Sequence, residues 1–484
     1  MTSNLANYLP SALIGLPWIG VIALVFVPER CTRIIKYVAG LTVVLPLAAG
    51  LKLAFDFRGV GGVEFSQYTD WMPALGITYW VGVDGISFAL LFLPLTLIPL
   101  AMLLACRESR QVRTRAVLLL ILESALLTAW LALDVWLFYF GFEVATLAVF
   151  ALMGLQNKAS ASAEARRFLM LNLIGSALLL LTLAACITPV GGQTNLASLV
   201  RQPLGFDDQV LWASVFVVAI TFKCALVPWH SSYRSPHGEL SALMRLTLGA
   251  LFLPVGIYAV LRFGYALFPL GLHSIRMEIR CFALLGLLIV TALAWTDRQG
   301  SRILSYFTIA MLAFALLGLT SFEESGVQGS LFLLLQHGWV LAVLSMVMAS
   351  GLLAGERGYR LAITAGALAV LAAMAFPGSN SFAGIFMILL SLFNEAPVIA
   401  GLMVAAWTLL AMAVFFQRRQ LRPTSDAGMH ALKGWALWCV LPFLILIAMG
   451  SITPHIFTNK SNNGVRHWLS VHGQTSPAQT DKAP

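Results

Sequence analysis

The chain has 484 residues, of which 59% are hydrophobic and only 11% are charged. Soluble domains carry about a quarter charged residues, so this composition excludes an ordinary water-soluble protein and leaves little chain for a soluble catalytic or nucleotide-binding domain. The formal net charge is +9, but in a multi-pass membrane protein such an excess collects in the loops on one side. We therefore expect a membrane protein that has no nucleic-acid partner.

Fourteen apolar segments follow one another along the chain, each bounded by charges, Gly, Pro or Asn. They cover residues 9–27, 34–54, 79–105, 116–133, 135–154, 168–188, 210–229, 239–263, 279–296, 302–320, 328–353, 361–390, 395–416 and 434–452. Because about 20 apolar residues are enough to cross a bilayer as a helix, the pattern predicts an all-α, polytopic integral membrane protein with about 14 transmembrane helices.

The basic residues predict how these helices are oriented. Nineteen Lys and Arg residues fall in loops that follow odd-numbered segments, and four fall in loops that follow even-numbered segments. Loops rich in Lys and Arg face the cytoplasm. Both termini are therefore predicted to lie outside the cytoplasm.

Two of the predicted helices are broken. Pro228 interrupts the seventh, and Pro377 with Gly378 interrupts the twelfth, because proline cannot donate a backbone hydrogen bond. The breaks lie five helices apart, as in inverted-repeat transporters. This spacing predicts two inverted five-helix repeats, helices 4–8 and 9–13. The corresponding divisions are residues 1–115, 116–264 and 265–417, with the last helix and a polar tail in 418–484.

Two charged residues lie inside the apolar segments and could carry chemistry. Glu143 lies in the middle of the fifth segment, and Lys223 lies in the broken seventh. A charge inside a bilayer costs several kcal/mol, so each such residue indicates function. If the two side chains meet, they form either a pair that exchanges a proton or a static ion pair that holds helices together.

Other ionisable residues lie in or beside the segments. Glu123 is a mid-membrane acid that suits a helix contact as well as proton transfer. Asp84 is near a helix start, where it is typical of a capping residue. His230, His237 and His337 could relay protons as neutral imidazoles, although a lone histidine more often only forms a hydrogen bond.

The remaining candidates for cofactor ligands do not form a site. The six cysteines are scattered without a C-x-x-C pair, so no iron–sulfur cluster is indicated. The histidines do not form the paired ligand set of a haem-binding bundle. The sequence therefore predicts no bound cofactor and no metal.

Seven motifs in a fixed order resemble a known family. They are YWVGVDGISFALL, FYFGFEVATL, FKCALVPWH, GIYAVLR, RILSYFTIA, LQHGWVLAVL and FPGSNSFAGIFMIL. In order and spacing they resemble the antiporter-like membrane subunits of bacterial respiratory complex I, the NADH:quinone oxidoreductase, and most nearly the chain M type, whose mitochondrial counterpart is subunit 4. The resemblance covers roughly residues 70–420.

The resemblance implies a translocase subunit. Family members have fourteen helices in two inverted repeats and move protons along a buried axis, while other chains oxidise NADH and reduce quinone. It assigns the axis glutamate to Glu143, the axis lysine to Lys223 and a relay histidine to His337. It also implies membrane and peripheral partner subunits, a bacterial inner-membrane location and no redox site in this chain.

Three positions depart from the family pattern. Pro254, Met311 and Ile385 stand where the family has polar relay residues, and only water would bridge the gap. Three accounts stay open for this departure. The chain is a divergent complex I subunit, a subunit of a related assembly (a membrane hydrogenase, a carbon-dioxide uptake complex or a multisubunit cation/proton antiporter), or mainly a scaffold. A stand-alone solute transporter is a further class. The electron donor and the ion specificity stay open.

Overall fold

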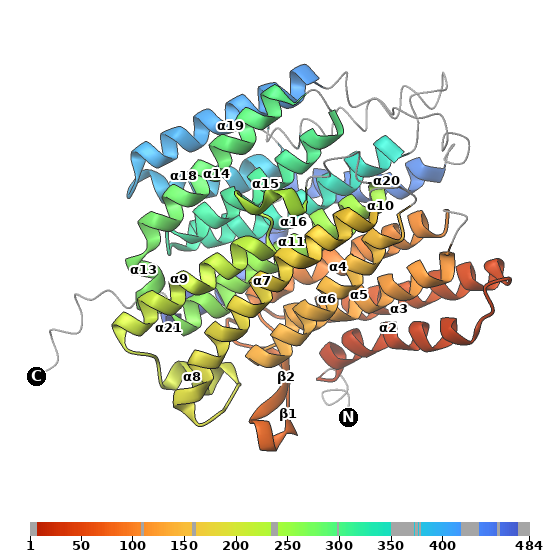
Figure 1. The fold of residues 1–484 in the computed structure, drawn as a ribbon, viewed down its shortest axis with the longest axis horizontal. Helices are drawn as coiled ribbons and strands as arrows, with labels where there is room; N and C mark the ends of the chain where they lie inside the picture. Colours follow the sequence, from red (N-terminus) through yellow and green to blue (C-terminus); the bar gives the residue numbers. More distant parts are fainter. Residues whose placement is uncertain are drawn as a thin grey trace, which may run out of the picture.

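The computed structural model describes residues 7–107, 111–156, 161–233, 241–297, 300–349, 372, 376, 379–417, 435–452 and 455–472. These residues form helices that run side by side in one bundle (Figure 1). Ten of the described helices are long and apolar enough to cross a membrane, which confirms the predicted multi-pass helical architecture. The total of fourteen stays a prediction, because much of the twelfth segment lies outside the described residues.

The helices of the bundle follow the predicted segments closely. The first three are α2 (Leu9–Phe26), α3 (Thr32–Asp56) and α4 (Gly85–Ala105). The next are α5 (Val112–Leu131), α6 (Val135–Gly154), α7 (Ala161–Ile187) and α9 (Phe206–Lys223). The later ones are α14 (Arg276–Thr296), α15 (Gly300–Leu319), α16 (Glu324–Ala349), α18 (Asn380–Phe393), α19 (Pro397–Gln417) and α20 (Trp435–Ile452).

The eighth segment is one continuous helical run with wide turns. It consists of α10 (Ala242–Met244), π-helical η4 (Arg245–Phe252), α11 (Leu253–Ala259), π-helical η5 (Val260–Gly264) and α12 (Tyr265–Leu267). Pro254 stands at a position where the family has a polar relay residue. Proline usually breaks a helix, but this helix continues through it. The π turns before and after α11 change the hydrogen-bond register, which accommodates the missing N–H.

Several short elements lie together at one end of the bundle, which we call the hairpin end (Figure 1). They are the antiparallel strands β1 (Glu64–Met72) and β2 (Ile77–Val83), and the helices α8 (Leu196–Arg201), α13 (Pro269–Ser274) and α21 (His455–His472). The prediction of a helix over 79–105 is wrong at its start. The β-branched and aromatic residues of β2 suit a half-buried strand, and the helix begins at Gly85.

Helix α21 occupies part of the segment that the sequence predicts as a polar tail. Its buried residues include Val465 and Trp468, whereas Arg466 and His467 are exposed. This division makes it an amphipathic helix, and its apolar face packs across the ends of α4 and α16. Helix α21 therefore covers the hairpin end.

The seventh helix is interrupted as expected. Helix α9 ends at Lys223, Ala225 adopts a left-handed φ of 51°, and the short turn η3 (Trp229–Ser232) follows Pro228. Because the chain leaves the helix here, Lys223 is the last residue of α9. The second expected break, at Pro377 and Gly378, lies outside the described residues, and α18 begins after it.

Glycines allow the closest helix crossings. A Cβ on Gly141 would lie 2.9 Å from the carbonyl oxygen of Ala125, and a Cβ on Gly175 would lie 2.9 Å from that of Ala219. Both distances are shorter than real Cβ contacts, so only glycine permits this approach. The crossings join α6 to α5 and α7 to α9.

A glycine pair attaches α21 to the bundle, and it provides a test of this closure. A Cβ on Gly464 would lie 2.6 Å from the Cα of Gly85, where α21 crosses the start of α4. Gly464→Ala is expected to loosen α21 at a cost of about 1–3 kcal/mol, since backbone cannot yield as a side chain does. Limited proteolysis in detergent measures this as faster loss of the C-terminal segment.

The control for this variant is Gly401→Ala on α19. A Cβ on Gly401 meets nothing within 4 Å. The C-terminal segment of this variant should therefore be cleaved at the wild-type rate. If Gly464→Ala is cleaved as slowly as wild type, the glycine crossing is not what holds α21.

Candidate functional site

The centre of the site is an ion pair inside the bundle. The Nζ atom of Lys223, at the end of α9, lies 2.6 Å from Oε1 of Glu143 on α6. The lysine side chain is fully buried, and the glutamate side chain is 20% exposed at the flank of the bundle. The two residues that the sequence singles out therefore lie in direct contact.

Three neighbours complete the surroundings of this pair. The hydroxyl of Ser176, on α7, lies 2.8 Å from Oε2 of Glu143. Thr146, one turn along α6 from the glutamate, accepts a longer hydrogen bond of 3.4 Å from Lys223. The ammonium group also lies 4.4 Å from the ring centre of Phe142, within the range of a cation–π contact. Each carboxylate oxygen therefore has a polar contact, and the amine has three favourable ones.

Local structure explains why the lysine is held here. A helix ends with carbonyl groups that carry partial negative charge, which favours a cation in the last turn. Lys223 occupies that place because α9 stops before Ala225 and Pro228. The close crossing at Gly175 then brings α7 beside the lysine stem, 3.1 Å from an added Cβ. The break in the helix and the glycine crossing together fix the position of the charge.

The other predicted residues are spread through the bundle. Glu123 on α5 and His337 on α16 are both fully buried, and their polar side-chain atoms have no hydrogen-bond partner among the described residues. The ring of His337 lies 5.3 Å from that of Phe307. His230 lies in the turn η3, and His237 lies outside the described residues. No described hydrogen bond or ion pair joins His337 or Glu123 to the central pair.

The three apolar replacements are buried. Pro254, Met311 and Ile385 are all enclosed by the bundle. Near Lys223, the rings of Phe142 and Phe252 lie 5.2 Å apart, and those of Phe168 and Phe252 lie 5.6 Å apart. Aromatic packing therefore lies beside Lys223 in the direction of the eighth helix.

A second buried ion pair, which the sequence does not indicate, lies at the hairpin end. Arg262 contacts both carboxylate oxygens of Asp84 at 2.6 Å, and its Nε donates to Tyr258 at 2.9 Å. Asp84 also caps α4 by accepting from the backbone N–H groups of Ile86 and Ser87, so its predicted capping role is confirmed. Burial opposes its ionisation, but Arg262 and the cap outweigh burial and hold the pKa of Asp84 below its ordinary value.

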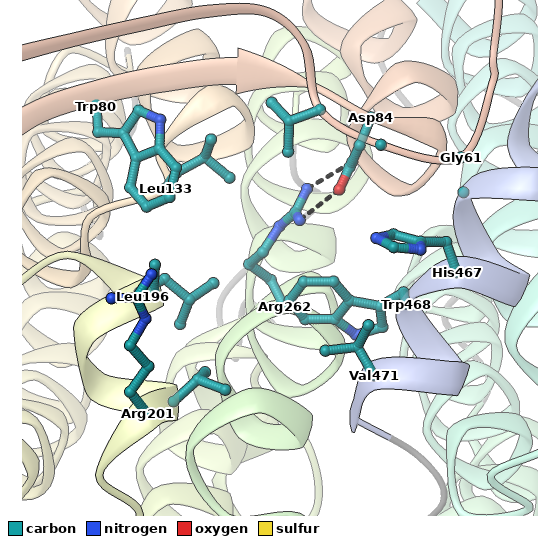
Figure 2. Close-up of a pocket in the computed structure, with 15 residues that line it drawn as sticks. Gly61, Trp80, Asp84, Leu133, Leu196, Arg201, Arg262, His467, Trp468 and Val471 are labelled. Atoms are coloured by element: carbon teal, nitrogen blue, oxygen red, sulfur yellow. Dashed lines mark hydrogen bonds and ion pairs between the residues drawn. The ribbon is translucent and has the colours of Figure 1, made fainter.

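A cavity of about 320 Å³ opens beside this second pair (Figure 2). Its walls come from β2, α8, the end of the eighth helix and α21. Arg262 lies 5.0 Å from the ring of Trp468, whereas Arg201 and His467 lie on opposite sides of the cavity (Figure 2). The cavity therefore lies at the hairpin end, away from the central pair.

A third charge pair lies in the second half. Arg280 on α14 contacts Glu395, between α18 and α19, at 2.5 Å, and donates to the hydroxyl and the carbonyl of Thr320. This pair joins three helices at the hairpin end. In the part of the chain that the structure describes, no group of three or more His, Cys, Asp and Glu residues could hold a metal ion.

The helical bundle and the ion pairs that it encloses place this chain in a class: multi-pass membrane proteins with charges inside the membrane region. Comparison with protein families makes the class specific. The family described as "NADH:quinone oxidoreductase/Mrp antiporter, TM" matches residues 132–418, which is more than half of the chain. The chain belongs to this family.

Individual relatives agree with that assignment. The chain is 26% identical to NADH-quinone oxidoreductase subunit M of Mycobacterium tuberculosis, with 98% of this chain and 96% of the relative covered. A chain in the structure of respiratory complex I from Thermus thermophilus has a TM-score of 0.81, 22% identity and coverage of 96% and 100%. A chain of the Mrp complex from Dietzia sp. DQ12-45-1b has a TM-score of 0.80, 18% identity and coverage of 97% and 52%.

The buried pair at the hairpin end generates a stability prediction. Asp84→Asn leaves the Arg262 charge buried without its counter-charge, so it is expected to destabilise the protein by about 3–5 kcal/mol. The measurement is thermal unfolding of the purified protein in detergent. The double variant Asp84→Asn with Arg262→Met removes the unpaired charge and should regain part of this loss.

The exposed pair Lys52–Asp56, in α3, is the matched control. Asp56→Asn is expected to change stability by less than about 1 kcal/mol, because solvent screens exposed pairs. Equal unfolding temperatures for Asp84→Asn and Asp56→Asn would show that the buried pair contributes no more to stability than the exposed pair.

Proposed function

We propose that this chain moves protons through the Glu143–Lys223 pair as the antiporter-like membrane subunit of a multisubunit assembly. The observation that carries the proposal is the 2.6 Å contact between a fully buried ammonium and a carboxylate inside an apolar bundle. Hydrophobic residues of similar size often pack as stably as a buried ion pair. A pair that costs energy and lies in a membrane region is best explained by its chemistry.

The proposed mechanism is a change of partner charge. While Glu143 is ionised, it stabilises the ammonium form of Lys223. When Glu143 binds a proton, the lysine loses its counter-charge, and burial then favours the neutral amine. The lysine therefore releases a proton to the next acceptor. Glu143 then passes its own proton to the neutral amine of Lys223, which restores the ion pair, and the cycle repeats with one proton taken up and one released.

The assembly that we propose is an NADH:quinone oxidoreductase in a bacterial inner membrane. The family and the relatives that carry this name support it. In this proposal other membrane and peripheral subunits carry out the oxidation and reduction, and the chain itself contributes the proton path. His337, Glu123, His230 and His237 are the proposed further members of that path.

A second candidate function has specific support. Pro254, Met311 and Ile385 cannot exchange protons, so the path beyond Lys223 lacks three polar side chains. A subunit of a related assembly, such as a multisubunit cation/proton antiporter, accommodates this difference, and the similarity to a chain of an Mrp complex supports it. A largely structural subunit with an incomplete path is the remaining alternative.

The central pair yields the main functional test. Lys223→Ala is expected to lower proton movement by at least about 10²-fold, because positioned proton-transfer groups contribute that much or more, while the assembly stays intact. The measurement is acidification of inside-out membrane vesicles that contain the chain in its native complex, driven by the electron donor of that complex. Glu143→Gln should have a similar effect.

Lys52→Ala is the control for this test, because Lys52 is an exposed lysine paired with Asp56 on α3. Its proton movement should match wild type. Wild-type acidification by Lys223→Ala in an assembled complex would overturn the proposed function. Native electrophoresis of the same membranes shows whether the complex has assembled.

The hairpin end is proposed to face the outside of the cell. The opposite end holds the start of α5, where Arg113 contacts Glu29, and the basic residues of the sequence are concentrated in loops after odd-numbered helices. The rule that such loops face the cytoplasm supports this orientation. Both termini are then outside, with α21 on the outer surface.

Cysteine labelling tests the orientation. Ser470→Cys places a thiol on the exposed face of α21, and Gln111→Cys places one at an exposed position before α5. In right-side-out vesicles, an impermeant maleimide should label Ser470→Cys beyond the wild-type background, and Gln111→Cys only after permeabilisation. The reverse pattern would place the termini in the cytoplasm.

A further inference from the structure

We propose that Ser176 is the hydroxyl through which Glu143 receives its proton, supplied by a water molecule held on the side-chain oxygen of Asn172. The proposal rests on the proposed function of the Glu143–Lys223 pair and names the uptake route to it. The route runs along one face of α7, from the end of the bundle opposite the hairpin end.

The geometry of Ser176 fits both protonation states of Glu143. Its Oγ lies 2.8 Å from Oε2 of Glu143 and 2.8 Å from the backbone carbonyl of Asn172. When the carboxylate is ionised, the single hydroxyl hydrogen is donated to it. When the carboxyl is protonated, its O–H donates to Oγ, and the serine hydrogen turns to the carbonyl of Asn172. In both states the serine hydroxyl and Oε2 of Glu143 stay hydrogen-bonded to each other.

Asn172 supplies an acceptor that the protein leaves open. The residue is 1% exposed, and its Nδ2 donates to the carbonyl of Phe168 at 3.1 Å. Since a carbonyl cannot donate, this contact fixes the amide orientation, and the opposite atom, Oδ1, has no partner among the described residues. A buried amide oxygen without a partner is costly unless water fills the place.

The spacing of the polar residues follows the helix. Three polar residues, Glu164, Asn172 and Ser176, lie in one row along α7 with the apolar Phe168 between the first two, and all four are buried. Asn172 and Ser176 are neighbours in this row, about 5–6 Å apart at Cβ, a gap that one water can bridge, whereas Glu164 is two turns from Asn172. The row begins in the first turn of α7, at the end proposed to face the cytoplasm.

The transfer step balances without any other reactant. The water on Asn172 donates one hydrogen to Ser176 Oγ as the serine hydrogen passes to Glu143 Oε2. Water on the inner side returns a proton to the remaining hydroxide. The net change is one proton moved from inner water to Glu143, with no oxidation or reduction.

The test compares variants in the intact complex in inside-out vesicles, where the bath sets the pH of the inner side. Ser176→Ala removes the hydroxyl and is expected to slow proton uptake about 10²-fold, the low end for a positioned proton transfer. Ser176→Thr retains a hydroxyl and should restore most of the rate. Asn172→Leu removes the water acceptor and should slow uptake as well.

The matched control is Thr182→Val. Thr182 is a fully buried hydroxyl on the same helix, bonded to the carbonyl of Leu178, and its loss should leave uptake at the wild-type rate. A second readout is the pH profile. In Ser176→Ala delivery becomes the slow step, so pumping should fall with rising inner pH over a range where wild type is unchanged.

The outcomes separate this inference from the proposed function. If Lys223→Ala is inactive but Ser176→Ala and Asn172→Leu pump at the wild-type rate, the uptake route is wrong and the pair stands. If Ser176→Ala and Ser176→Thr are equally slow with the wild-type pH profile, Ser176 has only a packing role and the route is again wrong. If Lys223→Ala pumps normally, the proposed function itself fails.

Discussion

An ionised side chain inside this bundle is stabilised where an opposite charge lies within contact distance. Water is scarce there, so the solvation that a charge loses must be replaced by a partner and by hydrogen bonds. Among the described residues, the pairs Glu143–Lys223, Asp84–Arg262 and Arg280–Glu395 are examples. The last two lie at the hairpin end and join helices, whereas the first lies within the apolar part of the bundle.

The three pairs differ in how completely they are satisfied. Asp84 accepts two hydrogen bonds from the guanidinium of Arg262 and two from the backbone at the start of α4, and both sets stabilise its ionised form. Glu143 has one contact to an amine and one to a hydroxyl that can reverse its role. A carboxylate with interchangeable partners suits proton exchange, and a carboxylate fixed by an arginine suits structural support. The chemistry of the partner thus separates the two kinds of pair.

The departures from the family lie beyond Lys223 in the proposed path. Pro254, Met311 and Ile385 are buried among apolar neighbours, while His337 and Glu123 are buried without described partners. The Glu143–Lys223 pair therefore belongs to a connected polar group, whereas His337 and Glu123 are single polar residues without a described hydrogen-bond partner. The proposed proton uptake to Lys223 would therefore use hydrogen-bonded side chains, whereas the proposed release beyond it would cross apolar packing.

The sequence by itself determined the membrane class, the positions of the apolar segments, the break after Lys223 and which charges are unusual. Hydropathy decides these features because each depends on residues near one another in the chain. It could not decide which charges meet: the partners are separated by 80 residues for Glu143–Lys223 and by 178 for Asp84–Arg262. It also missed the strand before Gly85, helix α21 and the contact of Ser176 with Glu143. In an apolar helix, the face that contacts lipid and the face that contacts a neighbouring helix have similar residues. Which helix surfaces face each other was therefore set only by tertiary packing at glycines such as Gly141 and Gly175.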